Sequence, residues 1–215
     1  MEWLKRIGRA VLTPASFGFQ TGHFRSSLQG AAVDRHGEPI PWYTYPAIWF
    51  LQQKDFSGKT ALEFGAGQST SWWAQRADKV VAFERNQRWY EHLKSLFPKN
   101  VELYYDPKGD MSGFEDLLRG RHFDVIVIDG QKRERAAEAA PELLAPGGVL
   151  LIDNSEGYGS QGRKSIVEPF HELGFSRVDF YGYAPGVLRT HCTSLLFRQT
   201  CFLLHSAENP AEKLF

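Results

Sequence analysis

Short apolar runs alternate with longer mixed segments from residue 59 onward. Five nearly continuous apolar runs have the length of strands, at 60–64, 79–84, 101–105, 124–128 and 148–153. Four mixed segments between them have lengths suited to helical crossover connections, at 69–77, 86–97, 111–119 and 132–145. Continuous apolar runs are typical of parallel strands buried on both faces, and such strands need long crossovers. The pattern predicts an α/β fold with a mostly parallel sheet and helices on both faces.

The rhythm changes after the fifth run. The sequence predicts a helix near 163–173, a strand over 176–183 and, after a loop, a strand at 194–197, with 202–204 as a candidate for one more. Two strands joined by a loop instead of a helix indicate an antiparallel edge. The expected fold is therefore a Rossmann-like seven-stranded sheet, mostly parallel, with an antiparallel last strand.

The first 58 residues have a different pattern. Residues 1–12 are expected to form a short helix, and residues 13–42, rich in Gly, Ser, Pro and His without a sustained period, an irregular arm. A further helix is expected over about 44–53. We therefore expect two parts, an N-terminal helix, arm and lid or oligomer segment over 1–58, and the α/β domain over 59–215.

The N-terminal helix has several interpretations. Its basic residues Lys5, Arg6 and Arg9 interrupt the apolar positions, so no uninterrupted apolar core of about 7–15 residues indicates a signal peptide. A helix lying on a membrane surface is one alternative. A cap on the domain or a homodimer contact through the N-terminal arm is the interpretation that we favour.

Composition narrows the class of protein. Lys+Arg and Asp+Glu both count 25, so no net charge attracts nucleic acid or acidic membranes, and we expect no nucleic-acid partner. No run reaches the roughly 18 apolar residues of a membrane span. The two cysteines, Cys192 and Cys201, lack CxxC spacing and are expected to be reduced thiols of a cytoplasmic protein.

The most informative motif lies at residues 60–70. An apolar run there contains Glu63, and Gly65 and Gly67 follow before a helix-like segment. A second apolar run ends at Glu84. Adjacent parallel strands bring such ends together, the glycines let the backbone approach a ligand, and Glu84 can accept hydrogen bonds from a ribose diol. These features outline a site for a nucleoside cofactor.

A longer ordered set of motifs resembles the class I S-adenosylmethionine-dependent methyltransferases. The set is the glycine loop, Glu84, Asp129 after the fourth strand, and Pro146-Gly147-Gly148 before the fifth, followed by the antiparallel pair. The resemblance covers residues 59 to about 205. It implies S-adenosylmethionine as the cofactor, and an enzyme that transfers its methyl group.

The same resemblance implies the residues that bind the cofactor. Glu63, Gly65 and Gly67 would surround its methionine end, Glu84 would hold both ribose hydroxyls, and Asp129 would lie beside it. Asp106, after the third strand, is a weaker candidate near the adenine, and we do not include it among the predicted site residues.

Ser69 and Thr70 leave two alternatives open. Both lie where a helix begins, so their side chains either contact the cofactor or cap that helix. Thr70 also separates this chain from its main competitor, a nicotinamide-dependent dehydrogenase, because the dehydrogenase fingerprint has a third glycine for close helix packing at that position.

The ends of strands four and five suggest a metal. Asp129, Lys132, Asp153 and Asn154 resemble the pattern of the metal-dependent catechol and caffeoyl-CoA O-methyltransferases. That resemblance implies Mg²⁺ bound by Asp129, Asp153 and Asn154, with Lys132 as the base that accepts the proton of the acceptor. Ordinary turn chemistry for Asp-Asn, and a solvated helix residue for Lys132, are the alternatives.

Two features depart from those metal-dependent families. They are Gly130 and the charged run Lys132-Arg133-Glu134-Arg135. A metal-free O-methyltransferase, or another small-molecule methyltransferase, therefore stays the main alternative. Asp129 is the catalytic candidate under both hypotheses.

The acceptor is less legible than the cofactor. Aromatic residues cluster before the first strand and after the first two, at 41–45, Trp49, 72–73 and 89–90. They either stack on an acceptor or adenine, or pack in the core. No Pro-Pro-aromatic or Pro-Cys element follows strand four, which argues against a DNA base as acceptor.

We expect methyl transfer to a small-molecule acceptor, in particular a hydroxyl. A non-catalytic or regulatory S-adenosylmethionine-binding protein of the same fold is the alternative from another class.

Overall fold

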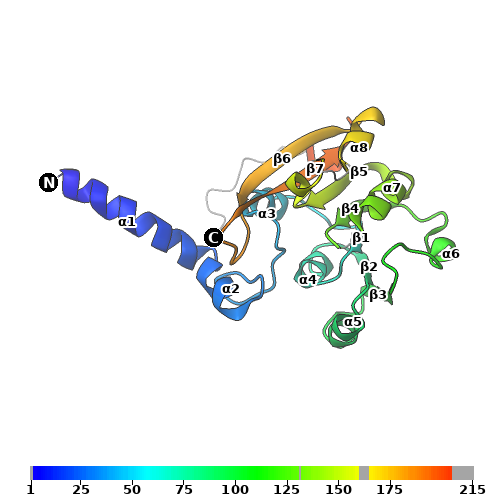
Figure 1. The fold of residues 1–215 in the computed structure, drawn as a ribbon, viewed down its shortest axis with the longest axis horizontal. Coiled ribbons are helices and arrows are strands. Elements are labelled where there is room, and N and C mark those ends of the chain that lie inside the picture. Colours follow the sequence, from blue (N-terminus) through cyan, green and yellow to red (C-terminus); the bar gives the residue numbers. More distant parts are fainter. Residues whose placement is uncertain (1, 131, 160–164, 205–215) are drawn as a thin grey trace.

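Seven strands form one mixed sheet in the order β3-β2-β1-β4-β5-β7-β6 (Figure 1). The computed structural model describes residues 2–130, 132–159 and 165–204. The strands are β1 Thr60–Phe64, β2 Lys79–Glu84, β3 Val101–Tyr105, β4 Phe123–Ile128, β5 Leu144–Asp153, β6 Ser176–Tyr183 and β7 Thr190–Phe197. Strands β1 to β5 are parallel, and β7 is antiparallel to both β5 and β6. The predicted fold class is confirmed.

Helices connect and cover the strands. After the N-terminal segment they are α3 Tyr45–Gln52, α4 Gln68–Ala74, α5 Gln87–Lys94, α6 Glu115–Leu118, α7 Arg133–Leu143 and α8 Glu168–Glu172, with 3-10 turns η1 Ser155–Gly157 and η2 Phe202–Leu204. Neighbouring residues of one strand enter different cores. Ala61 packs with Trp73 and Leu51 on one face of the sheet, whereas Leu62 packs with Ile126 on the other. Burial on both faces explains why these strands are continuous apolar runs.

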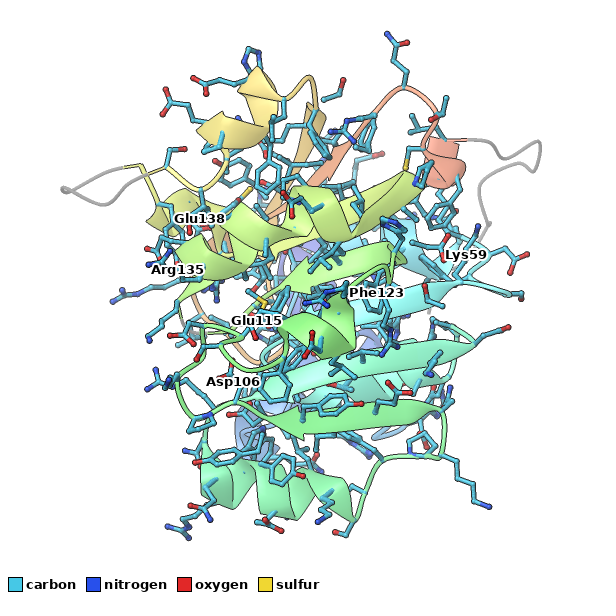
Figure 2. All side chains as sticks on the ribbon, turned by 90° about the vertical axis from the view of Figure 1, so that its right-hand side faces the viewer. Lys59, Asp106, Glu115, Phe123, Arg135 and Glu138 are labelled. Atoms are coloured by element: carbon cyan, nitrogen blue, oxygen red, sulfur yellow. The ribbon has the colours of Figure 1, made fainter. Side chains whose placement is uncertain are left out.

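The register aligns the carboxyl ends of the central strands. Phe64 of β1 pairs with Phe83 of β2 and with Ile128 of β4, and Ile128 pairs with Ile152 of β5. Figure 2 shows Lys59, just before β1, and Phe123, the first residue of β4, toward one end of the strands, and Asp106, just after β3, toward the other end. The residues that follow β1, β2, β4 and β5 therefore meet at one edge, at the switch point of the strand order where such folds bind ligands.

Some predicted elements are corrected. Residues 202–204 form the 3-10 turn η2 and not a strand. The helix predicted over 111–119 shortens to Glu115–Leu118, because Met111 and Gly113 adopt positive φ values of 61° and 93° that interrupt it. The helix predicted near 163–173 begins at Glu168, with Pro169 in its first turn; the start of that prediction lies outside the described residues.

The prediction of an irregular arm is wrong for residues 13–29, whereas a helix does form at the start of the chain. Helix α1 runs over Glu2–Gln20 and α2 over His23–Gln29, where we expected an irregular arm from residue 13. Packing at the end of α1 outweighs its local composition, since the Phe17 ring lies edge-on to Tyr45 at 5.3 Å between centroids. Figure 1 shows α1 extending away from the sheet, so it is not a cap on the domain.

The apolar positions of α1 are exposed, among them Trp3, Leu4 and Val11. The homodimer contact stays a prediction. Among the described residues, no helix is both long and apolar enough to cross a membrane. Tyr43, Ile48 and Leu51 are buried in the same core as Trp73, so α3 packs with the sheet, and the boundary at residue 58 also stays a prediction.

Candidate functional site

A cavity of about 500 Å³ opens at the aligned strand ends. The loops after β1, β2, β3 and β4 line it, together with the first turn of α7. The N-terminal segment contributes Gly30, Ala31 and Trp42 to the wall. Five of the predicted site residues line it, namely Gly65, Gly67, Ser69, Glu84 and Asp129.

The glycine loop is built by backbone packed on backbone. Gly65 has a φ of 103°, and a Cβ there would lie 2.6 Å from the Cα of Gly130. A Cβ on Gly130 would in turn lie 2.9 Å from the carbonyl oxygen of Phe64. Both positions therefore require glycine. Gly130, which separated this chain from the metal-dependent pattern, is explained by this contact.

The second glycine of the loop leaves room for a ligand. A Cβ on Gly67 would meet nothing within 4 Å, although the residue lines the cavity. The Gly67 N–H donates to the Thr70 hydroxyl at 2.9 Å, which fixes the start of α4. A side chain here would fill part of the cavity, so the loop fits the close approach that a nucleoside cofactor needs.

Glu63 is a buried carboxyl group that the protein satisfies only in part. The Thr70 hydroxyl donates to its Oε2, whereas its Oε1 has no hydrogen-bond partner within the described part of the chain. Burial raises the pKa of Glu63 to about 8, against the lowering effect of the Ser69 and Thr70 hydroxyls. Thr70 therefore serves the helix start and Glu63, whereas Ser69 lines the cavity.

Glu84 ends β2 at the cavity wall and is only 8 % exposed. Its Oε1 accepts the Asn86 N–H at 2.6 Å. Burial raises the pKa of Glu84, and the backbone N–H groups of Asn86 and Arg85 act against that rise. Its carboxylate is held in place by backbone and faces a cavity, which suits hydrogen bonds from a ribose diol.

The part of the cavity wall formed by the loop after β3 and by α5 contains Asp106 and Trp89. Asp106 accepts the N–H groups of Gly109 and Met111 at 2.9 and 2.8 Å, so it organises the loop after β3. The Trp89 indole N–H donates to the Ala66 carbonyl at 2.9 Å.

The aromatic residues divide between the two alternatives left open by the sequence. Trp72 and Trp73 are buried in the core, as the packing interpretation predicts. Trp42 and Trp89 are partly exposed and line the cavity. The Trp42 indole N–H donates to the Pro185 carbonyl at 2.9 Å, which ties the N-terminal segment to the loop after β6.

At the ends of β4 and β5 two of the predicted metal ligands, Asp129 and Asn154, contact the guanidinium of Arg133 with their side chains. Its Nη2 donates to Asp129 Oδ1 at 3.0 Å and to Asn154 Oδ1 at 3.3 Å. Its Nε and Nη2 also donate to the carbonyl oxygens of Gly130 and Asp129, both at 2.9 Å, and its Nη1 donates to the Asp153 carbonyl. The Arg133 side chain is only 11 % exposed.

The two aspartates of this cluster are both shifted. Burial raises the pKa of Asp129 to about 6, and the Arg133 charge limits that rise. Burial, with the negative charge of Asp129 as a second cause, raises the pKa of Asp153 well above its usual range. The Asp153 carboxylate is already engaged, because its Oδ1 accepts the Thr193 hydroxyl at 2.7 Å.

Lys132 lies apart from the other predicted catalytic residue. Its Nζ is 3.8 Å from Asp110 Oδ2, its side chain is 47 % exposed, and it does not belong to the described cavity lining. Its φ of 56° starts α7 in the left-handed region. The structure thus brings Asp129, Asp153 and Asn154 together around Arg133 and directs Lys132 to a neighbouring loop.

The side-chain oxygens of the predicted metal ligands already accept hydrogen bonds from within the protein. The guanidinium occupies the side-chain oxygens of Asp129 and Asn154, and the Thr193 hydroxyl donates to that of Asp153. Within the described ranges, no group of three or more His, Cys, Asp or Glu side chains has the arrangement of a metal site. Sequence reasoning missed the role of Arg133; its signal was the spacing of four residues from Asp129, at the start of the helix after β4.

No protein-family model matches this chain, and no curated protein sequence matches it. Solved structures do. An O-methyltransferase from Bacillus cereus in complex with SAH is 18% identical with a TM-score of 0.58, over 83% of this chain and 91% of that one.

Two further structures have similar scores. The O-methyltransferase TomG from Streptomyces achromogenes, involved in tomaymycin synthesis and in complex with SAM, is 18% identical with a TM-score of 0.56, over 75% of this chain and 82% of that one. A precorrin-6y C5,15-methyltransferase from Geobacter metallireducens is 17% identical with a TM-score of 0.54, over 71% and 87%. These likenesses confirm that the chain has the fold of class I S-adenosylmethionine-dependent methyltransferases.

Proposed function

We propose that this protein is an S-adenosylmethionine-dependent methyltransferase that methylates a hydroxyl of a small molecule. The observation that carries the proposal is the single cavity that combines the open backbone at Gly67, the Glu84 carboxylate and the Asp129 carboxylate. The O-methyltransferase structures with the same fold support it.

The cofactor half of the proposal rests on three fits. Glu84 offers a fixed carboxylate for the ribose diol, and Gly65 and Gly67 let the backbone come close to the ligand. The unsatisfied Oε1 of Glu63 lies beside the same loop. When bound, S-adenosylmethionine supplies a methyl group on a sulfonium, which is a good leaving group.

On the acceptor side, the residues of the chain have two tasks. Asp129 accepts the proton that the acceptor hydroxyl loses as its oxygen gains the methyl group, and a pKa of about 6 leaves its carboxylate ionised at neutral pH. Trp42 and Trp89 line the cavity and exclude water from it.

The charge balance of the chain favours a small-molecule acceptor over a nucleic acid. The cavity volume of about 500 Å³ lies in the range of small-ligand sites, which suits the cofactor. Gly30, Ala31 and Trp42 of the N-terminal segment contribute to its wall. The equal numbers of acidic and basic residues provide no general attraction for nucleic acid.

The test is turnover with radiolabelled S-adenosylmethionine across a panel of phenols, sugars and amines. We expect label transfer to a hydroxyl compound and tight binding of S-adenosylhomocysteine by calorimetry. Tight binding without turnover over a broad panel would favour a non-catalytic cofactor-binding protein. Thermal stabilisation by NAD and not by S-adenosylhomocysteine would favour the dehydrogenase alternative.

A further inference from the structure

We infer that Arg133 is a built-in cation that takes the place of a divalent metal at the ends of β4 and β5, so that methyl transfer in this protein needs no metal. The inference rests on the proposed function only in so far as it speaks of methyl transfer. The replacement itself concerns the described side chains and can be tested without turnover.

The first step is the chemistry of the cluster. Mg²⁺ in proteins binds carboxylate, amide and carbonyl oxygens. Oxygens of these three kinds, from Asp129, Asn154 and Asp153, receive hydrogen bonds from one guanidinium. The carbonyl oxygens of Gly130 and Asp129 complete the set. A hard-cation ligand set therefore already contains a positive charge.

The second step is the permanence of that charge. An arginine side chain stays protonated at all ordinary pH values. A metal at this position would have to displace a guanidinium held by several contacts, or lie beside it as a second cation in a poorly solvated site. Both arrangements are unfavourable, so the cluster is selective against a divalent cation.

The third step is what the guanidinium does mechanically. Arg133 is the first residue of α7 and contacts two strand ends. It reaches Asp129 and Gly130 after β4, and Asp153 and Asn154 at the end of β5. Its planar donors fix two strand ends relative to each other. Arg133 is thus a positioning residue that holds Asp129 at the cavity wall.

The electrostatic setting of Asp129 agrees with this role. Glu63, Asp153 and Tyr43 also interact with Asp129, and all three are acidic groups. Arg133 is the group that lowers the pKa of Asp129 against burial. Loss of the guanidinium should raise that pKa further.

The first experiment titrates the wild-type protein and an Arg133→Ala variant with Mn²⁺ and follows free Mn²⁺ by electron paramagnetic resonance. We expect no binding to wild type up to about 1 mM, and binding at least about tenfold tighter in Arg133→Ala, because the emptied oxygen set now accepts a metal. The added Mn²⁺ site should disappear in the Arg133→Ala, Asp129→Asn double variant.

A matched control lies two residues further along α7. Arg135 pairs with Glu138 at 2.9 Å on the exposed face of the helix, where Figure 2 labels both residues. Arg135→Ala should leave Mn²⁺ binding and turnover at wild-type values. Mn²⁺ binding to wild type that Asp129→Asn abolishes would overturn the inference. So would a folded Arg133→Ala protein that gains no metal.

A second experiment needs no variant that risks misfolding. The wild-type protein, dialysed against EDTA, should keep its turnover within about twofold; abolished turnover that Mg²⁺ restores would overturn the inference.

A third experiment compares two substitutions of Arg133. Arg133→Lys keeps the charge, so it should not bind Mn²⁺, and the acid limb of its pH–rate profile should stay close to that of wild type. Arg133→Ala should move that limb to higher pH, which a purely structural role would not do. A Lys variant that binds Mn²⁺ as Arg133→Ala does would contradict the role of the charge.

If no acceptor is ever found, the Mn²⁺ titrations still decide the inference. A wild-type protein that binds no metal and has no turnover would contradict the proposed function but not the replacement of the metal by Arg133. Turnover that depends on Mg²⁺ would support the proposed function and overturn the replacement.

Discussion

At the β1–β2 end the cavity is lined by backbone and one carboxylate, whereas at the β4–β5 end it is lined by side chains that are hydrogen-bonded to one another. Gly65 and Gly67 shape the first end by the absence of side chains. Asp129, Asn154 and Arg133 shape the second by their mutual hydrogen bonds. The first end can be recognised from a local motif, but the second depends on contacts between residues some twenty positions apart.

This difference teaches how far a resemblance can be extended. A loop defined by glycines tolerates few alternatives, because a Cβ at Gly65 would collide with the backbone of Gly130. The same cluster of oxygen atoms can bind a metal ion or accept hydrogen bonds from a guanidinium. Whether an arginine lies at the right position determines which of the two occupies the cluster. The pattern of aspartates and asparagine alone therefore does not identify a metal site.

The largest effect is expected at Asp129, which belongs to the β4–β5 end. Asp129→Asn keeps an oxygen that can accept the Arg133 Nη2 bond but removes the base, so turnover should fall at least about 10²-fold. In wild type, turnover should decline as the pH falls below about 6, where the Asp129 carboxylate becomes protonated. Initial rates over pH 5 to 9 measure both.

The circular dichroism spectrum and the melting temperature of the same variant serve as the control, and both should stay close to those of wild type. A fully active Asp129→Asn protein would leave the β4–β5 end without a catalytic role, and the contrast between the two ends would disappear.

The next effect belongs to the β1–β2 end. Glu84→Ala removes the carboxylate that the Asn86 N–H holds at the cavity wall, so S-adenosylhomocysteine should bind at least tenfold more weakly, equivalent to about 1.4 kcal/mol. Calorimetric titration measures it. Glu91, on α5 and outside the cavity lining, provides the control variant Glu91→Ala. Equal affinities for all three proteins would remove Glu84 from the site.

A third prediction concerns the pH dependence of stability and the buried Glu63. The pKa of Glu63 is about 8 in the folded protein, against the ordinary value of 4.5 for the unfolded chain. At pH values between 4.5 and 8, the folded state therefore holds a proton that the unfolded state has lost. The free energy of unfolding of the cofactor-free protein therefore falls as pH rises through that window, by up to about 1.4 kcal/mol per pH unit.

Glu63→Gln removes this dependence, because Gln does not titrate. Denaturant melts between pH 5 and 8 should give a flatter curve for the variant, and its advantage over wild type should grow with pH. Parallel curves for the two proteins would mean that Glu63 is ionised in the fold and compensated by a donor.

The β1–β2 end and most of the sheet could be predicted from the sequence, for a physical reason. The bounds of β1, β2 and β3 agree with the predicted runs at 60–64, 79–84 and 101–105. For β1 and β2 the reason is burial on both faces, which makes such strands nearly continuously apolar. The full length of α1 could not be predicted, since the contact of Phe17 with Tyr45 at its end joins residues that are far apart in the sequence.

The role of Arg133 escaped for a related reason. In the sequence it is one of four successive charged residues at the start of a helix, a place where solvated side chains are ordinary. Only the pairing of β4 with β5 brings Asn154 and the Asp153 carbonyl to it. The spacing of four residues from Asp129 is a local signal for one contact of Arg133, but the contacts with Asp153 and Asn154 leave none.

The smallest effect is expected at Lys132, and it distinguishes Lys132 from Asp129 as the base. The metal-dependent resemblance assigns Lys132 the part of the base, yet its Nζ lies 3.8 Å from Asp110 and its side chain is half exposed. Lys132→Ala should therefore change turnover by no more than about twofold, because an exposed ion pair contributes little. A loss of turnover beyond about 10²-fold, the range of a missing general base, would return the proton transfer to Lys132 and leave Asp129 with the cofactor alone.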